Sequence, residues 1–236
     1  MYNFPKYRVE MLEYEHFYKP EWSYYDLGDF EVVLEIFPNL KGYLQKGGFI
    51  RGNIGDELSG PELKVLKFES LAVNENFFEN IFKQDFPKLQ KFEVHIGRDL
   101  IHPVENINVF APLFSGDCFP ELTHLRLAGS FIADKIAYNI ANVPLIHQLK
   151  SLDLSGGLLH TRGAEILVNI LPKTNIEKLN LSNKVLDKEF YNSINPMKNK
   201  SGRPIEIIIK PQLDEREVLE ELDEMDRDIR KWREIV

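Results

Sequence analysis

The chain has 236 residues, of which 43% are hydrophobic and 28% charged, and its formal net charge is −8 at pH 7. These proportions are ordinary for a soluble globular protein and fit one domain or an elongated repeat array. The single cysteine, Cys118, excludes an internal disulfide. Because the sequence also shows no leader-like start and no run of about 18 apolar residues, we expect a cytoplasmic protein without a membrane span.

The negative charge is concentrated at the end of the chain. Residues 211–236 hold ten acidic and five basic side chains, so the preceding part carries only −3. Nonspecific binding to nucleic acid needs clustered Lys and Arg that neutralise several phosphates. The overall acidic balance therefore makes nucleic acid an unlikely partner.

Residues 1–39 form the first segment, and they are rich in aromatic side chains. These are Tyr2, Phe4, Tyr7, Tyr14, Phe17, Tyr18, Trp22, Tyr24 and Tyr25, among others. We expect an N-terminal cap that closes the first unit of the fold. An exposed aromatic patch for an interface is the alternative.

Residues 40–210 repeat one phrase, L-x-x-L-x-L, at intervals of 26, 33, 27 and 27 residues. A weaker copy at Leu40/Tyr43 precedes five copies at Leu63/Leu66/Phe68, Leu89/Phe92/Val94, Leu122/Leu125/Leu127, Leu149/Leu152/Leu154 and Ile176/Leu179/Leu181. This period is typical of a solenoid with one strand and one returning helix per unit. We predict an α/β leucine-rich-repeat solenoid, a short horseshoe with parallel strands on its concave face, helices on its convex face and capped ends.

Helical periodicity follows two of the phrases. Residues 133–142 and 161–171 each place their apolar side chains on one helical face. Thr161 and Asp187 are the expected N-caps. The long interval contains an insertion, residues 97–116, with a short helix expected near 109–114; either an accommodated insertion or a functional loop fits this pattern.

The last segment, residues 211–236, is predicted to be a charged amphipathic helix. It follows a final strand expected at 205–210, and its apolar residues recur at spacings of four and three. The stripe is short for an independent coiled coil. Docking on the solenoid as a cap and pairing with a second helix both remain open.

The outward positions of the strands define the candidate binding surface. One column reads Lys67, Glu93, Arg126, Asp153 and Asn180, so opposite charges alternate and can satisfy one another. Neighbouring columns hold the other candidates, which are Lys64, Lys91, His124, Lys150 and Lys178. A count over all columns, with Lys41 and Lys46, finds eight cations against four carboxylates. This excess favours an acidic partner, whereas a solvated mixed-charge surface is the alternative.

No catalytic or metal-binding constellation is visible. His95 and His124 fall on adjacent strands, but no Cys or carboxylate set completes a ligand cage. Phosphate-binding and nucleophile-elbow motifs are missing from the sequence. Cys118 is expected to be a buried apolar residue. We therefore expect no cofactor, no metal and no enzymatic activity.

The segments 119–127, 132–137, 149–155 and 162–165 resemble leucine-rich-repeat proteins of the ribonuclease-inhibitor-like subtype. More narrowly, they look like an uncharacterised bacterial family of such proteins that is sometimes associated with WGR-domain proteins. The resemblance covers about residues 36–195 and implies a curved binding scaffold. Where such proteins carry Asn or Cys after the phrase, this chain has Leu71, Gly97, Ser130, Gly157 and Lys184, so we expect less uniform loops.

These observations predict a non-catalytic scaffold that binds another protein, an acidic one being the favoured kind, on its concave strand face. The resemblance supplies an alternative, an inhibitor or immunity protein that neutralises a nuclease or toxin. Such targets are commonly basic, which the charge count does not favour. An enzyme is the third and least favoured class, and fold resemblance alone does not fix function.

Overall fold

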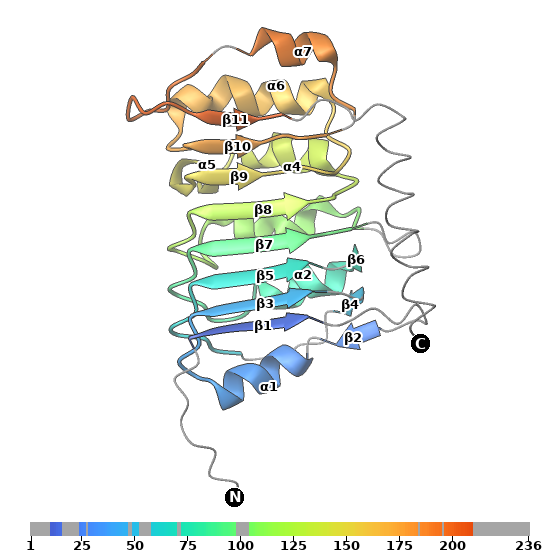
Figure 1. The fold of residues 1–236 in the computed structure, drawn as a ribbon, viewed down its shortest axis with the longest axis vertical. Helices are drawn as coiled ribbons and strands as arrows, with labels where there is room; N and C mark the ends of the chain where they lie inside the picture. Colours follow the sequence, from blue (N-terminus) through green and yellow to red (C-terminus); the bar gives the residue numbers. More distant parts are fainter. Residues whose placement is uncertain are drawn as a thin grey trace, which may run out of the picture.

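The computed structural model describes residues 10–15, 24–26, 28–46, 49–51, 58–69, 72–97, 104–183, 185–194 and 196–209. Its main feature is an eight-stranded parallel sheet in the order β1-β3-β5-β7-β8-β9-β10-β11 (Figure 1). The strands are β1 (Met11–Glu15), β3 (Gly42–Lys46), β5 (Val65–Glu69), β7 (Lys91–His95), β8 (His124–Ala128), β9 (Ser151–Asp153), β10 (Lys178–Asn180) and β11 (Glu206–Ile208).

Five of these strands, β5 and β7 to β10, come from the five repeated phrases. The phrases align residue for residue across the sheet, so that Leu66, Phe92, Leu125, Leu152 and Leu179 form one buried row. Alternate side chains of a strand point to opposite faces. The apolar positions therefore fill the core together, and the residues between them reach the other face.

The helices connect successive strands and cover one face of the sheet (Figure 1). They are α1 (Gly28–Ile36), α2 (Glu75–Ile81), α3 (Ala111–Ser115), α4 (Ala133–Ile140), α5 (Leu145–Gln148), α6 (Thr161–Ile170) and α7 (Lys188–Ser193), with short 3₁₀ turns η1 (Ile107–Phe110) and η2 (Leu171–Lys173). Helices α4 and α6 lie where the periodicity predicted them, and α3 lies near the short helix expected within the insertion. The opposite face of the sheet carries no described helix.

A chain of aromatic rings fills the first half of the core. Ring centroids lie 4.6 Å apart for Phe30 and Tyr43, and 5.0 Å apart for Phe68 and Phe77. The contacts continue to Phe119, and all these rings are at least 99% buried. Rings of this size bury much apolar surface and favour such tilted and edge-to-face geometries. The later units instead bury aliphatic side chains from α4 and α6.

A second, three-stranded sheet was not expected from the sequence. It consists of β2 (Tyr24–Asp26), β4 (Phe49–Arg51) and β6 (Ala72–Val73), all parallel, and it lies beside the ends of β1, β3 and β5 (Figure 1). Its strands have only two or three residues. So short a segment carries no readable alternation, which is why the sequence pattern missed it.

One predicted cap is wrong by one residue. His160, not Thr161, is the N-cap of α6, and the Thr161 hydroxyl instead donates to the Asp187 carboxylate at 2.7 Å. Asp187 is the N-cap position of α7, as predicted, but its side chain makes no capping bond. Thr161 and Asp187 therefore join the starts of two successive helices.

The two chain ends bear on separate predictions. Strand β1 pairs with β3, so part of the aromatic-rich segment 1–39 belongs to the main sheet. Most of its aromatic residues lie outside the described residues. The predicted tail helix, residues 211–236, also lies outside them, and its docking or pairing stays a prediction.

Candidate interaction surface

The open sheet face is the side of the main sheet away from the helices. Its central row is the one read from the phrases, with Lys67, Glu93, Arg126, Asp153 and Asn180 in register on five neighbouring strands. All five are half-buried. The row thus forms a band of polar side chains over five of the eight strands, and the register places the apolar residues Leu44 and Ile208 at its two ends.

Ion pairs organise the first half of this row. The Lys67 ammonium lies 2.6 Å from the Glu69 carboxylate and 3.6 Å from that of Glu93. Glu93, whose side chain is only 15% exposed, also contacts the Lys91 ammonium at 2.9 Å. The hydrogen bond from Lys67 is the main cause that lowers the pKa of Glu69. These four groups hold one another in place.

A second cluster surrounds Asp153 on β9. Its Oδ2 lies 3.4 Å from the Arg126 Nε and accepts a 3.0 Å hydrogen bond from the Asn180 amide. The Ser155 backbone N–H donates to Oδ1 at 2.9 Å. The prediction that alternating charges satisfy one another is therefore confirmed for Lys67 with Glu93 and for Arg126 with Asp153.

The two histidines do not form a pair. In the register between β7 and β8, His95 is opposite Ala128, and His124 is opposite Lys91. The rings are thus four residues apart along the strand direction, about 13 Å at the usual rise. Among the described residues, no three His, Cys, Asp or Glu side chains come together to hold a metal ion.

The surroundings of both histidines lower the pKa of their rings. Burial, followed by the charge of Arg126, lowers the pKa of His95. Burial also lowers the pKa of His124, and the charges of Lys91 and Lys150 lower it further. The Thr123 hydroxyl lies 2.9 Å from the His124 Nδ1 and fixes the ring beside these two lysines.

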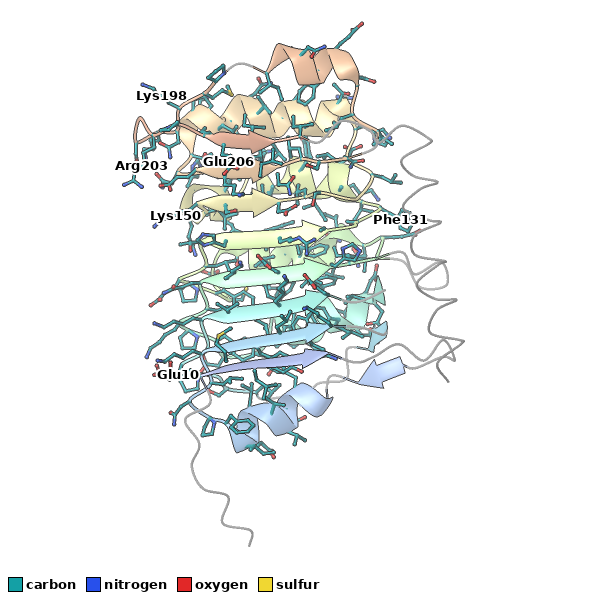
Figure 2. All side chains as sticks on the ribbon, viewed as in Figure 1. Glu10, Phe131, Lys150, Lys198, Arg203 and Glu206 are labelled. Atoms are coloured by element: carbon teal, nitrogen blue, oxygen red, sulfur yellow. The ribbon has the colours of Figure 1, made fainter. Side chains whose placement is uncertain are left out.

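The nine predicted binding residues occupy three parallel lines instead of one point. Lys67, Glu93, Arg126 and Asp153 form the central row, and Lys91, His124 and Lys178 lie one step nearer the strand starts. Lys64 and Lys150 immediately precede β5 and β9 and are exposed. Figure 2 shows Lys150 at the edge of the sheet where the strands begin.

The predicted cation excess was overestimated. The sequence count omitted Glu10, which pairs with Lys41 at 2.9 Å, and Glu206 of β11, which pairs with Lys178 at 3.3 Å. It also omitted Arg203, which pairs with Glu177. The two added carboxylates outnumber the one added cation, so the excess is smaller than the predicted four. The chain before the first phrase and after the last one therefore contributes to the surface.

Cys118 is half-buried and packs against the core. Burial raises the pKa of its thiol to about 12. A thiolate is the reactive form of cysteine, and at neutral pH this side chain holds almost none of it. Within the described part of the chain, no helix is long and apolar enough to cross a membrane.

Two comparisons by sequence find nothing: no protein-family model and no curated protein matches the chain. The fold is similar to a crystal structure of a protein from Bacteroides fragilis that was a structural-genomics target. The TM-score is 0.67 with 26% identity over 80% of this chain. This chain spans about half of that protein, 51% of its length. Fold and comparison together define an α/β protein with a main parallel sheet of eight strands and a repeated strand-and-helix arrangement.

Proposed function

We propose that this chain is a short leucine-rich-repeat solenoid that binds a partner protein on its open sheet face without catalysing a reaction. The observation that carries the proposal is the register itself. Five copies of one phrase present a continuous row of partly exposed polar side chains, while helices occupy the other face. Stacked repeats of this kind create extended surfaces that serve for binding.

The proposed centre of the site is the group Lys91, His124, Arg126 and Lys150. An acidic segment fits there, because Lys91 and Lys150 flank His124, and their positive charges add to burial in lowering its pKa. The surrounding predicted residues, Lys64, Lys67, Glu93, Asp153 and Lys178, would set specificity. Charged groups on such a surface steer encounter and reject wrong partners more than they add raw affinity.

Preorganisation supports this assignment. Lys67, Lys91 and Arg126 are each held by a carboxylate on the same face. Side chains that are already ordered lose less entropy when a partner binds. The balanced pairs also mean that binding exchanges one set of contacts for another, which favours a partner of matched shape and charge.

The test is capture of partners from native extract with the purified full chain. Lys64→Glu/Lys91→Glu reverses one charge at the start of β5 and one on the open sheet face, and Lys83→Glu/Lys135→Glu makes the same charge change on exposed residues of the helix side. We expect the first variant to lose a partner that the wild type and the second variant retain, as read by quantitative mass spectrometry.

Circular dichroism must show that both variants keep the wild-type fold. Arg126 is left unchanged, because its contact supports Asp153; Lys91 also pairs with Glu93, but its side chain is the more exposed of the two cations, 41% against 25%. If the sheet-face variant retains every partner of the wild type, the open sheet face is not the binding site.

A further inference from the structure

Three successive turns meet at one corner of the molecule, where β9, β10 and β11 begin. The Asn175 side-chain amide donates to the His147 carbonyl at 2.6 Å, and the Asn199 amide donates to the Asn175 carbonyl at 3.4 Å. The Lys200 backbone N–H donates to the Thr174 carbonyl at 2.8 Å. These bonds fix the turns side by side, although they are far apart in sequence.

This basic corner collects cations from all three turns. Its members are Lys150, Lys173, Lys178, Lys198, Lys200 and Arg203. Figure 2 shows Lys150, Lys198 and Arg203 on the same side of the molecule. Sequence analysis singled out only Lys150 and Lys178, because residues 198–203 follow the last phrase and precede the final strand.

Two carboxylates are present at the corner, and both are already paired. Glu177 contacts Arg203, and Glu206 contacts Lys178. The four remaining lysines, Lys150, Lys173, Lys198 and Lys200, are exposed and form no ion pair within the described residues. The corner therefore has an excess of four positive charges on a protein whose net charge is −8.

The turn at residues 198–204 is rigid, because buried Asn199 organises it. The Asn199 side-chain oxygen accepts hydrogen bonds from the backbone N–H groups of Ser201 and Arg203, both at 3.0 Å. The Asn199 backbone N–H donates to the Arg203 carbonyl at 2.9 Å, and Gly202 supplies the left-handed conformation at φ +76°. Because the backbone of this turn is already ordered, only the exposed lysine side chains lose conformational entropy on binding.

We propose that the basic corner binds an acidic segment of a partner protein, a run of Asp and Glu side chains that pairs with the four lysines that form no ion pair among the described residues. The corner shows its fit for carboxylates by holding Glu177 and Glu206 within ion-pair distance. Nucleic acid is the competing polyanion. Its duplex carries one charge per about 1.7 Å, so the acidic remainder of this protein repels it more strongly than a short acidic peptide.

The test uses the full chain and a fluorescent ten-residue glutamate peptide, with fluorescence anisotropy as the readout. We expect binding at 50 mM salt that weakens sharply at 500 mM, because salt screens exposed charges. Lys173→Glu/Lys200→Glu should weaken binding by about tenfold or more, since each reversal replaces an attraction by a repulsion. The matched variant Lys83→Glu/Lys135→Glu should stay within about twofold of wild type.

Equal affinity of the two variants for the glutamate peptide would overturn the proposal. A labelled ten-base-pair DNA duplex, tested in parallel, decides between polyanions: tighter binding of the duplex that the corner reversal abolishes would assign the corner to nucleic acid instead. Lys64→Glu/Lys91→Glu leaves the corner intact and should still bind the glutamate peptide. Failure of this proposal is thus distinct from failure of the open sheet face as a partner site.

Discussion

At the scale of single residues, the turn after β9 shows why this chain departs from the expected loop residues. Gly157 and Ser130 occupy equivalent positions after successive phrases. A Cβ built on Gly157 would lie 2.3 Å from the Ser130 carbonyl oxygen and 2.8 Å from its backbone nitrogen. The neighbouring turns therefore touch through their backbones, and the Leu158 N–H donates to that carbonyl at 2.9 Å.

Gly157→Ala should lower the free energy of unfolding by about 3 kcal/mol, because the backbone of one turn must shift and a hydrogen bond is strained. Gly156→Ala is the neighbouring control. Its φ is +73°, but nothing lies closer than 3.7 Å to an added Cβ, so it should cost about 1 kcal/mol. Urea denaturation measures both values, and an equal cost would argue against close packing of the turns.

His124 reports the electrostatic field of the open sheet face. Its pKa lies below the ordinary 6.5, so between these two values the unfolded chain binds more protons than the folded chain. Its contribution to stability is therefore lost as pH falls below about 6.5. Lys150→Met should raise the pKa of His124 toward 6.5, as measured by NMR titration of the ring protons. Lys135→Met, on the helix side, should leave it unchanged; equal titration curves in both variants would place Lys150 too far from the ring.

At the scale of whole elements, side chains at helix starts tie successive units together. The Asp134 carboxylate, in the first turn of α4, accepts a 2.8 Å hydrogen bond from the His160 backbone N–H and lies 2.6 Å from the His160 ring nitrogen Nδ1. His160 is the N-cap residue of α6. Thr161 and Asp187 repeat the arrangement between α6 and α7.

Asp134→Ala should destabilise the fold by about 1 kcal/mol, because it removes a partner of the backbone at the start of α6. The side chain is 41% exposed, so the ionic contribution is discounted. Asp117→Ala, at an exposed site whose side chain forms no hydrogen bond or ion pair with the described residues, should change stability by less than about 0.5 kcal/mol. Thermal unfolding measures the loss of stability in both variants. A loss for Asp134→Ala no larger than that for Asp117→Ala would show that the Asp134–His160 contact does not stabilise the fold.

The strands and helices that could be predicted from the sequence are those whose periodic apolar pattern extends over enough residues to be recognised. The phrases gave β5 and β7 to β10 because Leu125, Leu152 and Leu179 recur at one position of each unit. The last strand was also located correctly, as β11. The second sheet was not predicted, because strands of two or three residues have no distinctive pattern. The N-cap of α6 was misplaced by one residue, because His160 and Thr161 are adjacent polar residues and the sequence does not decide between them.

At the scale of the whole molecule, the surface could be predicted as far as the repeat extends. The row from Lys67 to Asn180 was assigned correctly because equal phrases align in register. The charge balance was not, since Glu10, Arg203 and Glu206 come from chain outside the phrases and reach the same sheet only through the fold. The basic corner was missed for the same reason. Asn199 and Gly202 are residue types typical of turns, and the sequence places them beside the three cations Lys198, Lys200 and Arg203.

The central claim is that partners contact the open sheet face, and site-specific photocrosslinking tests it most directly. Benzoylphenylalanine placed at Ser151, between His124 and Lys178 in the register, samples the open face; the same residue at Tyr138, which is 61% exposed on α4, samples the helix side. In native extract, irradiation should give a discrete crosslinked species from position 151 and none from position 138. Crosslinks from position 138 alone, or identical products from both, would contradict the account.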